Sequence, residues 1–200
     1  MTAKLSVILP THNPDASRLT RTLNALQAQS LSKDSWELLI IDNASHDENF
    51  VSNLNYSWHP SARVEREEKL GLSYARRRGI TESKAKLLVF VDDDNLLSET
   101  YLESVIEIFQ DHLRLAVIGG KSTPEFEVAP DFWVKDFYSC LALRDLGNEI
   151  RIADGAQAFS SYPDFAPIGA GMGLRKEVAL RYLENLKNNP ISDRSGTSLS

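Results

Sequence analysis

The segment VFVDDDNLL, residues 89–97, joins a run of strand-forming residues to three consecutive carboxylates. Valine and phenylalanine favour buried strands, so residues 86–91 are predicted to form one. Each ionised carboxylate makes its neighbours harder to ionise, so Asp92, Asp93 and Asp94 repel one another unless a cation or a set of hydrogen-bond donors relieves the charge. The segment therefore predicts a buried strand that ends at a site.

Other segments repeat this strand pattern and alternate with helical ones. Further strands are predicted over residues 4–10, 36–41, 62–67 and 115–119. Apolar residues recur at helical spacing in two segments between the strands, at Leu19, Leu23 and Leu26 and at Leu102, Val105, Ile106 and Phe109. Residues 72–84 have a helical and basic pattern. Strands that are apolar throughout and separated by helices indicate a mainly parallel open sheet with helices on both faces. The predicted fold class is α/β.

Capping residues predict where two of these helices begin. Asn13 is predicted to cap the first helix, because its side-chain oxygen can accept hydrogen bonds from the first turn. Ser98 or Thr100 is predicted to cap the helix after the aspartates, and Glu103 stands at capping-box spacing from Thr100.

Length and composition predict one globular domain. The chain has 200 residues, of which 42 % are hydrophobic and 25 % charged, which is enough for one sizeable core. Its formal charge of -6 and its pI of about 5.3 argue against a general nucleic-acid binder, which normally carries a basic face. We therefore expect no nucleic-acid partner.

The sequence also predicts where the protein works. The single cysteine, Cys140, cannot form an internal disulfide, and the residues after Met1 do not resemble a secretory signal. No apolar run reaches the ~20 residues needed to cross a bilayer, so any membrane contact of this chain should be peripheral. We expect a cytoplasmic location, which includes the inner face of the membrane.

Polar residues directly follow three of the predicted strands. Thr11 and Asn13 come after the first strand, Asp42 after the second, and the aspartate triplet after the strand that ends at Val91. In open sheets of this class, ligands bind beyond the carboxyl ends of the strands. We therefore expect these residues to converge on one edge of the sheet and to form a ligand site.

The aspartate triplet has two interpretations. In an extended segment alternate side chains share a face, so Asp92 and Asp94 should point one way and Asp93 another. Such a cluster suits a hard divalent ion, Mg2+ or Mn2+, which takes one or two carboxylates together with water and substrate phosphates. The alternative is a solvated turn that caps the next helix. The position at a strand's carboxyl end, facing two other polar strand ends, favours the metal.

Other signals in the chain are weaker. The tripeptide Gly120-Lys121-Ser122 imitates the end of a phosphate-binding P-loop, but the residues before it lack the required first glycine. The glycine-rich residues 169–173 predict a close approach of backbone to a ligand or to a strand. Arg76 is the arginine expected to reach a diphosphate, because a guanidinium group offers paired donors. An aspartate-based phosphatase, which also places Asp-x-Asp after a strand, is an alternative class of enzyme.

Two groups of residues are predicted to be structural. Phe132, Trp133, Phe137 and Tyr138 are assigned to the core, with sugar stacking as the alternative. The four histidines show no metal-like spacing and are predicted to be surface or capping residues.

Five segments match, in order, those of a known enzyme family. They are SVILPTHN (6–13), LLIIDNASHD (38–47), GLSYARRRGI (71–80), VFVDDDN (89–95) and GAGMGLRKEV (169–178). The chain resembles the inverting glycosyltransferases of family two, which have the GT-A fold, over nearly its whole length. The resemblance implies one GT-A domain over residues 1–200 that transfers a hexosyl group from a nucleoside-diphosphate sugar, expected to be UDP-linked, to a glycan or lipid-linked acceptor.

The resemblance also implies roles for residues of these segments. Thr11 and Asp42 would hold the nucleotide base, and Arg76 would lie near the nucleotide. Asn13, two residues after Thr11, is counted with this nucleotide-sugar site.

Further roles are implied for the acidic and glycine-rich segments. Asp92 or Asp93 would contact the ribose, and Asp94 would bind the divalent ion. The segment Gly169-Ala170-Gly171 resembles the acceptor-side strand, which helps to wall the donor sugar.

The catalytic base is where the chain departs from the family pattern. The family's base is a carboxylate, usually in an acidic pair after the helix that follows the Gly-Ala-Gly segment. Glu177 and Glu184 should lie on that helix, and Asp193 has no acidic neighbour, which leaves Asp193 a weak candidate. We expect the base to lie beyond Ser200, in a domain truncated at its carboxyl end. A catalytically idle nucleotide-sugar binding module is the alternative.

Overall fold

The protein is described by a computed structural model that covers residues 3–47, 50–154 and 163–188. The strands in these ranges are β1 (Leu5–Thr11), β2 (Trp36–Asp42), β3 (Ala62–Arg66), β4 (Leu87–Phe90), β5 (Val117–Ile118) and β6 (Gly173–Arg175). The helices are α1 (Ala16–Gln27), α2 (Leu72–Glu82), α3 (Tyr101–Asp111) and α4 (Lys176–Asn188), with 3-10 helices η1 (Lys33–Ser35), η2 (Phe50–Asn53) and η3 (Phe132–Cys140).

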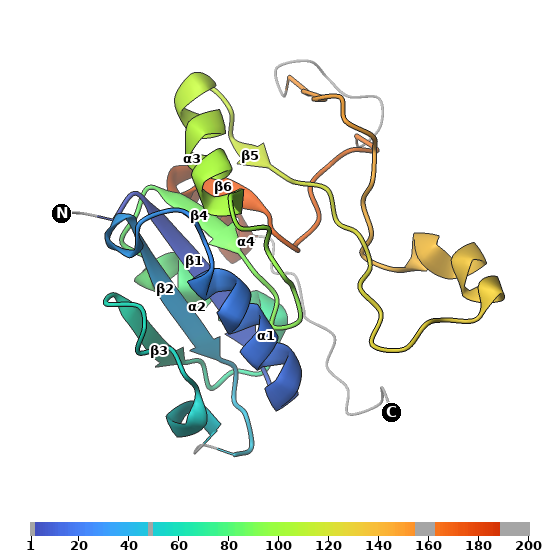
Figure 1. Cartoon of the computed structure of the whole chain (residues 1–200). Helices are drawn as coiled ribbons and strands as arrows, with labels where there is room; N and C mark the ends of the chain where they lie inside the picture. Colours follow the sequence, from blue (N-terminus) through green and yellow to red (C-terminus); the bar gives the residue numbers. More distant parts are fainter. Residues whose placement is uncertain (1–2, 48–49, 155–162, 189–200) are drawn as a thin grey trace.

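The strands form a single sheet in the order β3-β2-β1-β4-β6-β5. The first four strands of this order are parallel, whereas β6 is antiparallel to both β4 and β5. Helices cover both faces of the sheet (Figure 1). The predicted α/β class with a mainly parallel open sheet is thus confirmed.

The strands are apolar on both sides because both faces of the sheet are covered. Val7 and Leu9 of β1 belong to the core shared with α1 and α3, whereas Ile8 belongs to the core shared with α2 and α4. Gly79 brings α2 close to β1, since a Cβ at this position would lie 2.3 Å from Cγ2 of Ile8. This three-layer packing holds the strand ends in fixed positions.

A buried carboxylate ties the amino ends of the strands together. Glu37 of β2 is 2 % exposed. Its carboxylate accepts hydrogen bonds from Ser6 Oγ and from the backbone N of Lys84, both at 2.5 Å, and from Arg63 Nη1 at 2.6 Å. Burial by itself would raise the pKa of Glu37, but these three donors outweigh it and hold the pKa below its ordinary value.

The structure corrects the predicted cap of α1 and, for α3, confirms the position of the predicted cap but not its hydrogen bond. Asp15, rather than Asn13, caps α1, because its Oδ1 accepts from the backbone N of Ser17 and Arg18 at 2.9 and 3.0 Å. Thr100 stands at the cap position of α3, but its side chain makes no capping hydrogen bond. Glu103 accepts from Ser30 Oγ instead of closing a capping box. The side chains of Asn13 and Glu103 are therefore used in other contacts.

His59 is a core residue, so the prediction that it lies at the surface or in a cap is wrong. Its ring is 3 % exposed and lies between Trp36 and Trp58, with ring centroids 4.1 and 5.4 Å away. Burial lowers the pKa of His59 to about 4, and the nearby charge of Lys33 adds to the effect. The neutral imidazole is therefore the form that packs in this core.

The segment between β5 and β6 leaves the sheet, and its aromatic residues are exposed. Figure 1 shows η3 well away from the layers of the sheet and its helices. Phe132, Trp133 and Phe137 are 88 %, 52 % and 56 % exposed, so the prediction that this group belongs to the core is wrong. None of the helices formed by the described residues has the length and apolarity to cross a bilayer.

Candidate functional site

The polar ends of β1, β2 and β4 meet at one edge of the sheet, as predicted. Thr11 pairs with Asp42 in the parallel register of β1 and β2. The hydroxyl of Thr11 also donates a hydrogen bond to Oδ2 of Asp93, just beyond β4, at 2.5 Å. These residues form one polar rim, while their roles in holding a nucleotide stay predictions.

A cavity of about 460 Å³ opens at the Asp42 end of this rim. Oδ2 of Asp42 accepts from Arg66 Nη1 at 2.5 Å, and Oδ1 accepts from the backbone N of Ser45 at 3.1 Å. Val51 and Val64 give the cavity an apolar wall. An apolar wall with a few fixed polar groups is a usual lining of small-molecule sites.

Two asparagines fasten the loops around this end, and one of them was not predicted. Asn43 donates to the carbonyls of Glu67 and Lys69 at 3.2 and 2.8 Å and accepts from the backbone N of Gly71 at 2.7 Å, so it holds the loop that leads into α2. Asn13 accepts from the backbone N of His46 at 2.9 Å, which joins the loops after β1 and β2. The sequence signal for Asn43 was its place beside Asp42 in a polar turn after a strand.

The aspartate triplet is turned, so the extended geometry expected for it is wrong. The backbone N of Asn95 donates to the carbonyl of Asp92 at 3.1 Å. Each carboxylate consequently has its own surroundings: Asp92 accepts from Arg76 at 3.1 Å and Asp93 accepts from Thr11. Asp94 is exposed and accepts from Asn95 Nδ2 at 3.2 Å. The three carboxylates therefore have different partners.

Burial and repulsion act most strongly on Asp93. Burial raises the pKa of this carboxyl, and the charges of Asp94 and Asp92 add to the rise, while the hydrogen bond from Thr11 opposes it. The ionised form of Asp93 thus costs free energy in the folded chain.

Arg76 lies beside Asp92, and Gly169 makes room for its guanidinium. The guanidinium of Arg76 contacts Asp92 and stacks near Phe90, with its Cζ 5.4 Å from the ring centroid. A Cβ at Gly169 would lie 2.4 Å from Nη2 of Arg76. The close backbone approach predicted for the glycine-rich segment is therefore real, and here it is made to an arginine.

The same segment continues beside the end of β4. The backbone N of Gly171 donates to the carbonyl of Phe90 at 3.0 Å, and the backbone N of Phe90 donates to the carbonyl of Met172 at 3.0 Å. The hydroxyl of Tyr101 donates to the carbonyl of Gly171. Burial raises the pKa of Tyr101 to about 12, so this hydroxyl keeps its proton. Gly171 has φ of 71°, a left-handed conformation that favours glycine.

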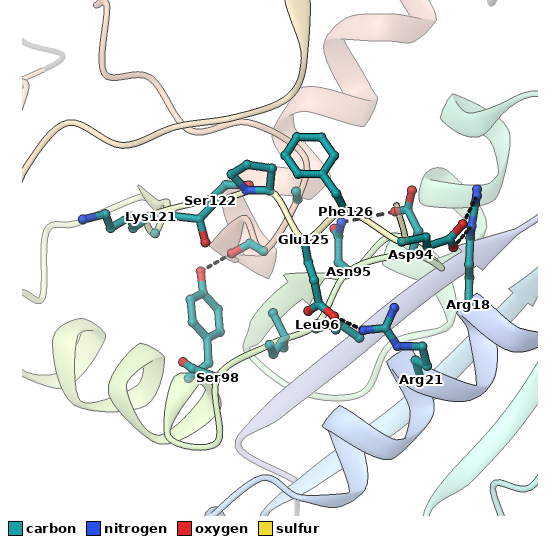
Figure 2. Close-up of a pocket in the computed structure, with 18 residues that line it drawn as sticks. Arg18, Arg21, Asp94, Asn95, Leu96, Ser98, Lys121, Ser122, Glu125 and Phe126 are labelled. Atoms are coloured by element: carbon teal, nitrogen blue, oxygen red, sulfur yellow. Dashed lines mark hydrogen bonds and ion pairs between the residues drawn. The ribbon is translucent and has the colours of Figure 1, made fainter. Parts of the chain in front are cut away.

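A larger cavity, of about 690 Å³, borders Asp94 (Figure 2). Its walls come from α1, the loop after β4, the segment after β5 and the glycine-rich segment. The residues that line it are Arg18, Arg21, Asp94, Asn95, Leu96, Leu97, Ser98, Tyr101, Gly120, Lys121, Ser122, Thr123, Pro124, Glu125, Phe126, Glu127, Ala170 and Gly171. Sequence reasoning missed Arg18 and Arg21, because on the sequence alone they are ordinary polar positions of an amphipathic helix.

The donor set at Asp94 fits a hard divalent ion completed by a ligand. Among the residues that the structure describes, no three His, Cys, Asp or Glu side chains gather closely enough to hold a metal by themselves. Mg2+ and Mn2+ are commonly held by one or two carboxylates plus substrate phosphates and water. The exposed carboxylate of Asp94, at the border of the cavity, meets that need, and the cofactor stays a prediction.

The catalytic base is not assigned to a residue of the described chain. Asp193, the weak candidate, lies outside the described residues. Glu177 stands in the first turn of α4, as expected from the sequence.

Curated relatives share part of the sequence. The chain is 30 % identical over 131 residues to the poly(ribitol-phosphate) beta-N-acetylglucosaminyltransferase TarP of Staphylococcus aureus (strain N315), a match that covers 61 % of this chain and 40 % of TarP. It is 30 % identical over 101 residues to the glycosyltransferase AglE of Haloferax volcanii, which covers 50 % of this chain and 33 % of AglE. The chain thus spans less than half the length of these relatives.

Solved structures share the fold. The crystal structure of residues 1–349 of S. aureus TarS matches with a TM-score of 0.55 and 24 % identity, covering 64 % of this chain and 38 % of that one. The complex of TarS 1–349 with UDP-GlcNAc matches with a TM-score of 0.54 and 23 % identity, covering 64 % of this chain and 37 % of that one. At this identity the likeness shows a common fold, which is of the GT-A type.

The family is shown by a match over most of the chain. The model of Glycosyl transferase family 2 matches residues 6–183. The match runs from β1 to α4 and includes Thr11, Asp42, Arg76 and the aspartate triplet, so the phosphatase alternative is dropped. The chain therefore belongs to glycosyl transferase family 2.

Proposed function

We propose that the chain binds a UDP-linked sugar and takes part in its transfer, with inversion, to a hydroxyl of a glycan or lipid-linked acceptor. One observation carries the proposal: Thr11, Asp42 and Asp94 lie along one edge of the sheet, with a cavity at each end. TarP is named as an N-acetylglucosaminyltransferase, and TarS structures include complexes with UDP and UDP-GlcNAc. The activity of the whole protein is part of the proposal, because the chain spans less than half of TarP.

The donor is placed along this edge from the smaller cavity to the larger one. The nucleotide base lies beside Asp42, against the apolar wall of the smaller cavity, and the ribose lies near Asp92 or Asp93. The diphosphate lies between Arg76 and Asp94.

Asp94 is the residue that would hold Mg2+ or Mn2+, with its carboxylate oriented by Asn95. The ion, when bound, offsets the negative charge that gathers on the departing diphosphate. Arg76 offsets part of the same charge from the other side, through donors fixed by Asp92 and Phe90.

The transfer step takes place in the larger cavity. The segment Gly169-Ala170-Gly171 forms a wall with little side-chain bulk, which leaves room for the sugar. A carboxylate base removes the proton of the acceptor hydroxyl, the oxygen bonds to the anomeric carbon, and the diphosphate oxygen leaves with the electron pair of its bond. Attack opposite the leaving group inverts the configuration. We place the base at Asp193 or beyond Ser200.

Calorimetry with UDP, with and without Mn2+, tests the proposal on the full-length protein. Asp94→Asn should weaken the Mn2+-dependent binding at least tenfold, whereas Asp111→Asn, at the far end of α3, should leave it unchanged. Tight binding that is indifferent to both Mn2+ and Asp94 would overturn the assignment. Release of UDP from UDP-GlcNAc by the full-length protein separates the enzyme from an idle binding module, which would bind without turnover.

A further inference from the structure

Two arginines stand side by side at the wall of the larger cavity. Arg18 and Arg21 are three positions apart on α1, which brings their Cβ atoms to about 5–6 Å from each other. Both line the cavity that Asp94 borders, and their side chains are 53 % and 45 % exposed. The two arginines bring two guanidinium groups to one wall of the cavity.

Two glutamates from the segment after β5 form ion pairs with these arginines. Glu127 accepts from Arg18 through both carboxylate oxygens, from Nε at 2.9 Å and from Nη2 at 3.2 Å. Glu125 accepts from Arg21. Figure 2 shows both arginines reaching from α1 toward the segment that carries Glu125 and Phe126. The paired geometry at Arg18 is the geometry in which a guanidinium group also binds phosphate.

The glutamates can be displaced. Their side chains are 64 % and 55 % exposed, and ion pairs at such exposure contribute little to stability because water and salt screen them. A phosphodiester matches a carboxylate in charge and in its two free oxygens, and a chain with several phosphodiesters can engage both arginines at once. A ligand that brings phosphate into the cavity can therefore exchange for Glu125 and Glu127 without unfolding any element.

Asp94 is close to this pair, which connects it to the transfer site. The hydrogen bond to Glu127 is the main cause that raises the pKa of Arg18, and the charge of Asp94 adds a smaller share. A phosphate held by Arg18 and Arg21 would thus lie near the proposed metal position at Asp94. Arg76 does not line this cavity, so the two phosphate positions are distinct.

We propose that Arg18 and Arg21 bind a phosphate group of the acceptor, and that Glu125 and Glu127 fill this position until the acceptor arrives. The inference rests on the proposed function and names the class of its acceptor: a polyol or glycan chain that carries phosphodiesters next to the hydroxyl that receives the sugar. The diphosphate of the donor could also supply a phosphate to these arginines, and the test below distinguishes the donor from the acceptor.

The test measures binding of a short glycerol-phosphate oligomer to the full-length protein in the presence of UDP and Mn2+. The double variant Arg18→Ala/Arg21→Ala should bind the oligomer at least tenfold more weakly. The double variant Glu125→Gln/Glu127→Gln should bind it severalfold more tightly, because the competing carboxylates lose their charge. Arg114→Ala and Glu107→Gln, both on exposed positions away from the cavity, are the matched controls. A neutral oligosaccharide should show neither effect.

Opposite signs for the two double variants are the decisive result, since a merely structural contact would make both variants weaker. Weakening by both, or equal binding of the neutral oligosaccharide, overturns the inference. Loss of UDP affinity in the arginine variant assigns the pair to the donor and also overturns it. UDP binding by the unaltered protein is measured independently of the oligomer. If the proposed function is wrong, UDP binding fails. If only the acceptor site is wrong, UDP binds and the oligomer results fail.

Discussion

The hydroxyl of Thr11 and Oδ2 of Asp93 lie 2.5 Å apart although 82 residues separate them in the sequence. This hydrogen bond joins the end of β1 to the middle of the aspartate triplet. It gives the central carboxylate a partner of its own, while Asp92 pairs with Arg76 and Asp94 remains at the cavity. The charge concentrated after β4 is thereby divided among three different tasks.

Asp93→Asn should stabilise the folded chain at neutral pH. The pKa of Asp93 is raised in the folded state, so its contribution to stability is present below the ordinary pKa of 3.8 and is lost as pH rises through the raised value. Removing the charge should therefore raise the free energy of unfolding at neutral pH. Urea unfolding at pH 3.5 and pH 7.5 checks this: the gain should appear only at the higher pH. A variant less stable than the unaltered chain at pH 7.5 would contradict the prediction.

Gly169→Ala should weaken UDP binding by about tenfold, the equivalent of about 1.4 kcal/mol. The new Cβ meets Nη2 of Arg76 at 2.4 Å, so the guanidinium must leave its position beside Asp92. Calorimetry with UDP and Mn2+ measures the loss. Arg76→Ala and the double variant complete the cycle: if Gly169 acts through Arg76, the double variant binds no worse than Arg76→Ala. Additive losses would show that the glycine acts by another route.

Glu37→Gln should destabilise the fold without touching the ligand site. Glu37 has a depressed pKa, so its contribution is present above its ordinary pKa of 4.5 and is lost as pH falls through the folded value. Loss of the charge leaves Arg63 with a weaker partner and should cost about 2 kcal/mol at pH 7. Chemical unfolding measures this, with the exposed Glu107→Gln as control. UDP affinity should not change, because Glu37 lies at the opposite end of β2 from Asp42.

His59 should make the fold sensitive to mild acid. The pKa of His59 is about 4 in the folded chain and ordinarily 6.5. As pH falls from 6.5 toward 4, the imidazole is therefore protonated in the unfolded state but stays neutral in the folded state. The free energy of unfolding should drop by about 2 kcal/mol between pH 7 and pH 5 from this residue alone, at about 1.4 kcal/mol per unit. His59→Asn should remove most of that slope, and His112→Asn should not. Tryptophan fluorescence reports the transition, since Trp36 and Trp58 flank the ring. Equal slopes for the two variants would count against this account.

The elements that could be predicted are those whose signal is local. The apolar runs of β1, β2 and β4 and the leucine spacing of α1 each reflect burial of a whole face, and the polar residues that end these strands had to meet once the strands were parallel. The capping of α1 was missed because Asn13 and Asp15 are both good caps, and the choice was made by the contact of Asn13 with the loop after β2. The exposure of Trp133 and the pairing of Arg18 with Glu127, 109 residues away, depend on where the long segment after β5 runs, which no local pattern records.

The sheet order has a consequence for the moment at which the site becomes complete. Among the described residues β6 is the last strand along the chain, yet it lies between β4 and β5. During synthesis the Asp42 cavity can form as soon as β3 has paired with β2. Residues 169–175 form part of the wall of the larger cavity and include Gly169, which accommodates Arg76. They are available only after the ribosome has released them. Until then β5 also has no neighbour in the sheet. In the nascent chain the cavity at Asp42 can therefore form well before the larger cavity is complete.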